Sequence, residues 1–331
     1  MIIQKIDYAS RRTHFVARRP PAILAAMTQT TQAPPRNLAA VAATGVAFSA
    51  IWSSAFVAGK FGLPYMDPLA LLTVRFLMTG AILAALQWLL DRPFAMPGLL
   101  VRKALVLGLL NNAVYLGLSF EALQYMSPGL VVIVISSGPF LTTALAAAIG
   151  LERLTPWRLA GIMVGFAGIL LIVATRPVGE ASPLGLAMAA CGTLSFAAGT
   201  VYYRAHLVAA DPLLVNFLQS LSGGAALLVC VGLLVPLQAV QPAPALLGSL
   251  AYLTAVVSIG GMLLWFRLVR DAGPGVASSF HLLNPVFGVL LSWAAFGTPI
   301  RPSDWLGIGI VATGLLLVTQ RAHPQPRGNR R

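Results

Sequence analysis

The sequence predicts an all-α polytopic membrane protein with ten transmembrane helices, arranged as two inverted five-helix repeats. Three observations predict this fold. The composition is strongly apolar, the apolar runs are as long as a membrane-spanning helix, and a series of short motifs recurs after about 145 residues.

The composition excludes an ordinary soluble domain. Of the 331 residues, 58% are hydrophobic and only 9% are charged, whereas soluble domains carry about 25% charged residues. A soluble fold so poor in charge could not cover its surface, so lipid must be the solvent for most of the chain. The apolar runs approach 20 residues, which predicts helices rather than the roughly 10-residue alternating strands of a barrel.

Proline-rich connections divide the apolar sequence into ten segments. Many of these segments begin with proline, whose missing N–H costs nothing in the first turn of a helix. The connections are short, and none leaves room for an extramembrane domain. The predicted spans are 39–61, 68–90, 101–120, 126–149, 157–174, 184–205, 212–236, 246–266, 274–297 and 304–320.

The distribution of Lys and Arg predicts the orientation. With the N-terminus inside, the inside segments hold 18 of the 22 basic residues and the outside segments hold 3, while Arg75 lies within a span. The positive-inside rule therefore predicts that both termini lie in the cytoplasm. Residues 1–38 and 321–331 are expected to be polar, basic cytoplasmic tails. No secretory signal is expected, and either Met1 or Met27 could be the start.

An ordered series of motifs predicts the internal repeat. Asp67-Pro68-Leu69 recurs as Asp211-Pro212-Leu213, and the paired glycines and prolines are Gly80 with Gly224, Pro139 with Pro285, Gly161 with Gly307 and Gly168 with Gly314. The repeats are 39–175 and 184–320. Five is an odd number, so the second repeat must enter the membrane from the opposite side, and the halves are related by a pseudo-two-fold axis in the membrane plane. Such halves favour alternating-access transport of a substrate bound between them.

Several segments also resemble a known family. IWSSAFVAGKF at 51–61, DPLALLTVRF at 67–76 and the stretch from 119 to 171 are similar to EamA-type transporters of the drug/metabolite transporter superfamily. The resemblance covers both repeats, and it implies a ten-helix inner-membrane transporter, often an exporter of amino acids or other small metabolites. One departure is Glu152, which is matched by Thr298 in the second repeat.

Arg75 is the one lysine or arginine deep inside a predicted span, about 10 Å from its end at 1.5 Å per residue; the others within the spans lie at their ends. Arg75 either attracts an anion at a cavity wall or is a structural arginine paired with Glu121 or with backbone carbonyls. Polar and aromatic residues within the spans complete the candidate cavity, because substrate sites mix apolar walls with a few polar groups. The candidates are Trp52, Ser53, Phe56, Arg75, Asn111, Asn112, Tyr115, Tyr202, Met262, Trp265, Ser278, His281 and Asn284.

These candidates also have structural interpretations. The serines and asparagines could be helix-packing points, and Met262 with Trp265 could be ordinary core. Tyr202 is taken as the repeat mate of Phe56. His281 could couple transport to protons or be a hydrogen-bonded core histidine. Pro139 and Pro285 should kink their helices as paired gating hinges or simply set their shape.

Other functions find little support in the sequence. It shows no motif of a hydrolase, metal site or phosphate-binding loop, so no enzyme activity, cofactor or metal is expected. The expected partners are a small-molecule substrate and the lipid bilayer, without nucleic acid. Uptake or exchange of a sugar or sugar-nucleotide, a non-transporting membrane protein and a lipid enzyme are the alternatives. Substrate, direction, proton or exchange coupling, and a monomeric or homodimeric state stay open.

Overall fold

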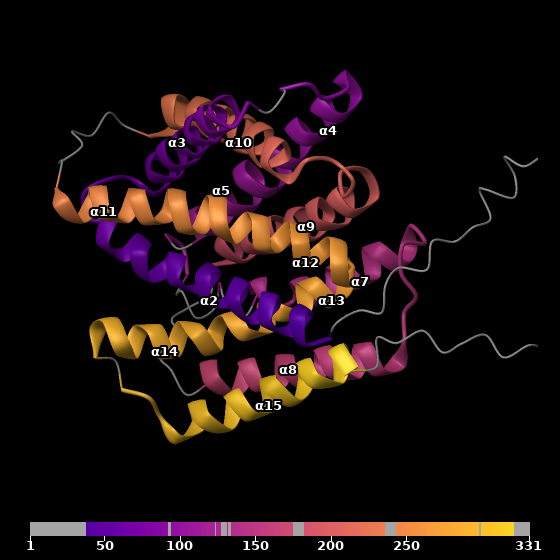
Figure 1. Cartoon of the computed structure of the whole chain (residues 1–331). Coiled ribbons are helices and arrows are strands. Elements are labelled where there is room, and N and C mark those ends of the chain that lie inside the picture. The colour runs from indigo at the N-terminus through magenta and orange to yellow at the C-terminus, as the bar shows by residue number, and fades with distance from the viewer. Residues whose placement is uncertain are drawn as a thin grey trace, which may run out of the picture. The chain divides into compact units, whose positions relative to one another are not determined.

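A computed structural model of the chain describes residues 38–91, 94–122, 124–126, 131, 134–174, 182–235, 243–297 and 299–320 (Figure 1). Both predicted tails lie outside the described residues, apart from Leu38, which begins the first helix. Within these ranges the regular structure is entirely helical, as predicted. In chain order, the helices are α2 Leu38–Gly62, α3 Pro68–Leu89, α4 Gly98–Gly108, η1 Leu109–Leu116, α5 Gly117–Ala122, α7 Gly138–Ala148, α8 Pro156–Ala174, α9 Pro183–His206, α10 Pro212–Leu234, α11 Pro244–Tyr252, η2 Leu253–Gly261, α12 Met262–Ala272, α13 Pro274–Ser279, η3 Phe280–Leu283, α14 Asn284–Phe296 and α15 Pro302–Gln320.

Nine helical stretches of the described chain are long and apolar enough to cross a membrane. Three of them are composite: α4, η1 and α5 form one continuous stretch, α11, η2 and α12 form another, and α13, η3 and α14 form the third. The predicted span 126–149 is described only in part, and its clearest element is the short apolar helix α7. The prediction of an all-α polytopic membrane protein is therefore confirmed.

The repeated Asp-Pro-Leu motif marks two helix starts. Asp67 Oδ1 accepts hydrogen bonds from the backbone N–H groups of Leu69 and Ala70, at 2.9 and 3.3 Å, before α3. Asp211 Oδ1 accepts one from Leu213 at 2.8 Å before α10. In both places the carboxylate satisfies N–H groups that have no partner within the helix, and proline occupies the first turn, where it is tolerated.

Two pairs of equivalent helices show the inversion directly. In the first pair, a β-carbon added at Gly161 of α8 would lie 2.7 Å from the carbonyl oxygen of Gly314 in α15, and one added at Gly168 would lie 2.7 Å from that of Gly307. Gly161 and Gly307 are repeat mates, as are Gly168 and Gly314. Gly161 therefore faces the repeat mate of Gly168, and Gly168 faces the repeat mate of Gly161. This crossed pairing requires the two helices to run antiparallel. Figure 1 shows α8 and α15 side by side.

The helices α3 and α10 repeat this geometry. Gly80 faces the backbone of Leu221, and Gly224 faces the side chain of Leu77. These residues again form mates at the same offset, because Gly80 corresponds to Gly224 and Leu77 to Leu221. Small residues let the helix backbones approach closely, which membrane helices need because lipid tails are as apolar as their own side chains.

Both repeats also interrupt their helices at matching places. The π-helical segments η1 and η2 lie in equivalent spans, and such wide turns are frequent at functional sites. Pro139 and Pro285 each stand in the first turn of a new helical segment, α7 and α14, where η3 precedes the latter. Pro285 lies at the junction of η3 and α14 within one continuous helical stretch, and Pro139 begins α7 after a turn at Ser136 and Ser137. Regular α-helical bonding is therefore interrupted at both prolines, and their role as gating hinges stays a prediction.

The surface of the described bundle is apolar, as a lipid-facing surface should be. Four exposed tryptophans lie near helix ends: Trp88 and Trp157 at one end of the bundle, Trp293 and Trp305 at the other. Tryptophan concentrates at the two membrane interfaces because its ring is apolar and its N–H is polar. The exposed tryptophans therefore mark both edges of the membrane-embedded part.

The α8–α15 contact generates a stability prediction. Gly314→Ala places a methyl group against the backbone of Gly161 and Gly165, so we expect a loss of about 1–3 kcal/mol from forced separation of the helices. Thermal unfolding of the purified protein in detergent measures it. Gly309→Ala is the matched control, since no atom lies within 4 Å of the added carbon. Equal unfolding temperatures for the two variants would contradict the close contact.

Candidate functional site

Six rings from both repeats form a cluster at the centre of the bundle. Phe48 and Trp52 come from α2, and Tyr115 from η1, in the first repeat. Phe196 of α9, Trp265 of α12 and His281 of η3 come from the second. All six side chains are buried. We call these residues the aromatic cluster: Phe48, Trp52, Tyr115, Phe196, Trp265 and His281.

The rings of the aromatic cluster contact one another in ordered pairs. The rings of Phe48 and Phe196 both stack on the indole of Trp265, with centroid distances of 4.8 and 5.4 Å. Tyr115 lies 4.6 Å from Phe196, and Trp52 lies 5.4 Å from Phe48 and 6.5 Å from Phe196. Such arrangements add to the energy of burial. The cluster therefore joins α2 and η1 of one half to α9 and α12 of the other.

His281 lies at the edge of this cluster, with its ring nearly perpendicular to those of Phe48 and Phe196. Its Nδ1 is 2.9 Å from Asn284 Nδ2, while its buried Nε2 has no hydrogen-bond partner. Ser53 of α2 donates to the carbonyl oxygen of Asn284 at 3.1 Å. Buried polar atoms normally find partners, so the free Nε2, together with the unpartnered Nε1 of Trp265, gives this apolar cluster two unused polar atoms.

A polar network lies beside the aromatic cluster. Arg75 Nε donates to Ser258 Oγ at 2.7 Å, and Asn216 Nδ2 donates to the carbonyl oxygen of Ser258 at 2.9 Å. Gln219 Nε2 donates to Asn216 Oδ1 at 2.9 Å, and Asn112 Nδ2 donates to the carbonyl oxygen of Gln219 at 3.2 Å. The network thus joins α3 and η1 of the first repeat to α10 and η2 of the second.

A small cavity of about 10 Å³ separates this network from the aromatic cluster. It has room for about one water molecule. Trp52 belongs to both its wall and the aromatic cluster, so the two regions adjoin. The lining residues are Trp52, Arg75, Phe76, Asn112, Leu116, Asn216, Ser220, Ser258 and Met262.

The suggested pairing of Arg75 with Glu121 does not form. Glu121 instead accepts a hydrogen bond from Gln124 Nε2 at 2.8 Å, and no ion pair within the described part of the chain includes Arg75. The guanidinium also lies 5.2 Å from the ring of Phe76, within cation–π range. Its charge is therefore buried without a carboxylate from the described residues.

Other predicted site residues lie apart from this centre. Asn111 is buried against Gly199 of α9, and its amide has no hydrogen-bond partner. Tyr202 packs on His206 near the end of α9, with centroids 4.7 Å apart. Ser278 bonds back to the carbonyl oxygen of Gly275 in its own helix. The side chain of Phe56 lies outside the described residues.

Sequence reasoning missed Phe48, Phe196, Asn216 and Ser258. A signal for one of them was available, because the offset of 144 that relates Asp67 to Asp211 also relates Trp52 to Phe196. The offset of 146, which relates motifs later in the chain, was applied to Phe56 and gave Tyr202 as its mate. Phe48 and Ser258 carry no distinguishing signal, since each is an ordinary residue of an apolar helix.

A second contact between the halves lies at the end of the bundle where α2 begins. The Glu152 carboxylate pairs with Arg158 of α8 and accepts a hydrogen bond from the backbone N–H of Gly275 in α13, at 3.3 Å. A β-carbon at Gly273 or Gly275 would collide with this carboxylate, and Gly273 also has a φ of +85°. We call this contact the Glu152 clamp. Its repeat counterpart Thr298 lies outside the described residues.

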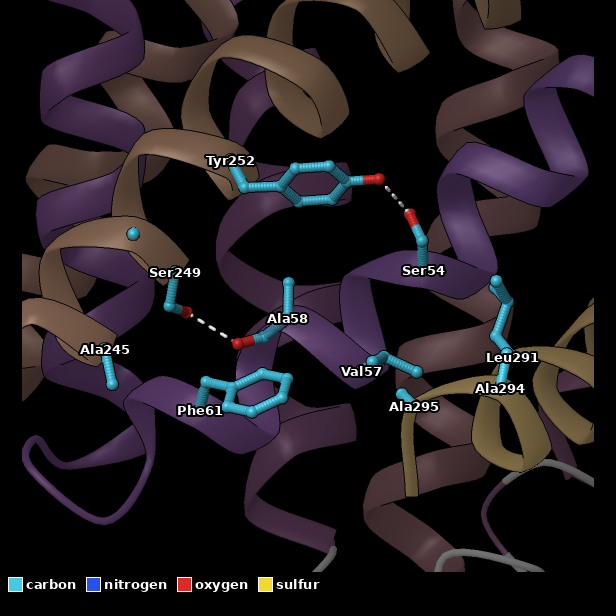
Figure 2. A pocket seen from close by; sticks show the side chains of 11 residues that line it. Ser54, Val57, Ala58, Phe61, Ala245, Ser249, Tyr252, Leu291, Ala294 and Ala295 are labelled. Atoms are coloured by element: carbon cyan, nitrogen blue, oxygen red, sulfur yellow. Dashed lines mark hydrogen bonds between the residues drawn. The ribbon is translucent and has the colours of Figure 1, made fainter. Parts of the chain in front are cut away.

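A wider groove of about 580 Å³ lies between α2, α11 and α14 (Figure 2). Ser54 and Tyr252 share a hydrogen bond of 2.7 Å there, and Ser249 donates to the carbonyl oxygen of Ala58 at 2.7 Å. The other lining side chains are apolar, and Phe61 and Tyr252 are exposed. None of the predicted cavity residues lines this groove, so the aromatic cluster with the Arg75 cavity is the better candidate site.

The family model of EamA-like transporters matches the chain twice, over residues 38–174 and 183–320. The chain belongs to the EamA-like transporter family. The two matched stretches coincide closely with the two predicted repeats, which explains why the equivalent helices pair antiparallel at α3–α10 and α8–α15. Membership confirms the resemblance that the sequence motifs indicated.

Similar proteins agree with this assignment. The uncharacterized inner membrane transporter YedA of Escherichia coli K12 is 29% identical, over 81% of this chain and 87% of its own. The uncharacterized transporter YvbV of Bacillus subtilis is 25% identical, over 83% and 90%, and the protein PecM of Dickeya dadantii is 25% identical, over 81% and 88%. One solved crystal structure, 19% identical, shares the fold with a TM-score of 0.73 over 86% of this chain and 98% of its own.

The Glu152 clamp of this EamA-like transporter generates a second prediction. Gly275→Ala should displace the carboxylate and destabilise the protein by about 1–3 kcal/mol, because an added methyl group has no space there. Thermal unfolding in detergent measures the change. Gly288→Ala serves as control, because its added carbon meets no atom within 4 Å. A Gly275→Ala protein as stable as the control would show that the clamp does not hold.

Proposed function

We propose that this chain exports small organic metabolites, amino acids or related compounds, across the inner membrane by alternating access. The proposal rests above all on one observation: the aromatic cluster and the polar network are both assembled from the two inverted repeats. A site built at such an interface is exposed to either side of the membrane when the halves rock against each other.

The chemistry of the centre suits a small amphiphilic molecule. Rings such as Trp52, Phe196 and Trp265 offer apolar and π surfaces, while Arg75, Asn112 and Ser258 offer hydrogen-bond donors a short distance away. Ligand sites commonly combine an apolar wall with a few oriented polar groups. In the described conformation the rings touch and the cavity holds about one water molecule, so substrate would bind when the halves separate.

Alternating access needs places where the halves can bend and places where they can close. The broken helices at Pro139 and Pro285 and the wide π-turns of η1 and η2 supply bending points near the centre. The Glu152 clamp supplies a closing contact between the repeats at one end. With both termini in the cytoplasm, as the distribution of Lys and Arg predicts, that end is the cytoplasmic one.

The names of similar proteins support the transport assignment and the membrane. YedA is named as an inner membrane transporter and YvbV as a transporter, each without a stated substrate. A growth screen of an overexpressing strain against toxic amino-acid analogues and metabolites would find candidate substrates. Flux of the hits in proteoliposomes then tests the proposal, and the absence of flux for all of them would overturn it.

The aromatic cluster gives the sharpest variant. Trp52→Ala should lower flux in proteoliposomes about tenfold or more, because truncating a buried aromatic anchor commonly costs over 1.4 kcal/mol of binding. Trp293→Ala is the control, since its ring is 55% exposed on the surface of α14. Flux is compared at equal amounts of reconstituted protein. Equal losses of flux and folded protein in the Trp52 variant would remove the case for a substrate contact.

A further inference from the structure

We propose that the Arg75 cavity is a subsite for a carboxylate group, so that the transported molecules are organic acids or zwitterions with an apolar body. This inference rests on the proposed function, since it names the substrate class of the same central site. It begins from a charge that the protein itself does not neutralise.

Arg75 carries a positive charge that no acidic side chain of the described residues balances. Arg75 is only 3% exposed, yet its one hydrogen bond in the described chain is from Nε to a neutral hydroxyl, Ser258 Oγ. A buried cation without a counter-charge is costly in a membrane and marks a functional site by default. The terminal nitrogens of the guanidinium remain as the donors that an anion from outside the protein could use.

The repeat itself supplies an internal comparison. At the offset that relates Asp67 to Asp211, Arg75 corresponds to Gln219. The Arg75 side chain of α3 bonds to η2 through Ser258 Oγ, whereas Asn112 of η1 donates to the backbone carbonyl oxygen of Gln219 in α10. The Gln219 side chain bonds to Asn216 of its own helix, so the equivalent junction in the other repeat is made without a charged residue. Because a neutral residue suffices for the packing, the charge of Arg75 is free for another role.

The surroundings favour a carboxylate among the anions. The cavity borders Asn112, Asn216, Ser220 and Ser258, which are neutral groups capable of donating hydrogen bonds. No acidic side chain lines it. A guanidinium binds a planar carboxylate with two parallel hydrogen bonds. In the described conformation the cavity has room for about one water molecule, so the carboxylate would enter when the halves separate.

The neighbouring aromatic cluster indicates where the rest of the molecule would lie. Trp52 borders the cavity and also contacts Phe48, Phe196 and His281. A carboxylate held by Arg75 would therefore place its attached carbon chain or ring against these side chains. An ammonium group on the same molecule could lie over the aromatic faces, which attract cations.

Binding of matched probes to the purified protein tests the subsite. We expect benzoate and phenylalanine to raise the unfolding temperature in detergent, because a ligand that binds only the folded state stabilises it. Benzamide, which has nearly the shape of benzoate but no charge, should have little effect. A larger shift with phenyl phosphate than with benzoate, an equal shift with benzamide, or no shift with either carboxylate at millimolar concentration would overturn the proposal.

Variants of Arg75 locate the effect. Arg75→Gln copies the residue of the other repeat and should lose the response to benzoate, whereas Arg301→Gln, at an exposed surface position, should keep it. A full response in Arg75→Gln would overturn the proposal. If that variant does not fold, Arg75→Lys decides, since an ammonium lacks the planar fork and should weaken benzoate binding about tenfold. An unchanged affinity in Arg75→Lys would then be the contradicting result.

Flux separates this proposal from the broader one. Wild-type protein that binds benzoate through Arg75 but moves no compound into or out of proteoliposomes would refute transport and leave the subsite standing. Flux of carboxylate substrates that is unchanged in Arg75→Gln would instead support transport and refute the carboxylate subsite.

Discussion

The bilayer interior offers no hydrogen-bond partner to a protein, and the structure is organised around that constraint. Helices satisfy the backbone, and the remaining polar side chains gather where the two repeats meet. Glycine positions such as Gly161 and Gly314 bring α8 and α15 into backbone contact, while the hydrogen bonds among Arg75, Ser258, Asn216 and Gln219 lie in the interior. The outer surface is left to aliphatic and aromatic residues that lipid can cover.

The inverted repeat gives the two halves matching contacts, because equivalent helices that run antiparallel make the same contacts twice. The proposed transport cycle would use this symmetry to open the interface toward either side in turn. The central rings are contributed by both halves, and the π-turns and helix breaks fall at matching places in the two. Motion of one half against the other would therefore change the environment of Trp52 and His281 without unfolding any helix.

Much of this architecture could be predicted from the sequence. The spans follow from apolar length, the repeat from motifs such as Asp67-Pro68-Leu69, and Trp52, Arg75, Asn112, Trp265 and His281 from their polarity or ring size within spans. Phe48 and Ser258 could not be found, because nothing in an apolar helix distinguishes the face that meets its partner. Tyr202 was chosen with an offset of 146, and a two-residue change in the repeat offset turns a helix by more than half a turn. The interruptions at Pro139 and Pro285 could be predicted from proline itself, but the short η3 turn before Pro285 could not.

The two repeats are not equal, and the Glu152 clamp shows where they differ. The carboxylate that joins α13 to α8 at one end has threonine, residue 298, as its counterpart in the second repeat. A carrier with matched closures would spend equal time shut on either side. In the proposed alternating-access cycle, the Glu152 clamp would lengthen the time during which one side is shut, and the empty carrier would then spend longer open to the opposite membrane face. A single carboxylate would thus set how long the empty carrier takes between releasing one molecule and binding the next.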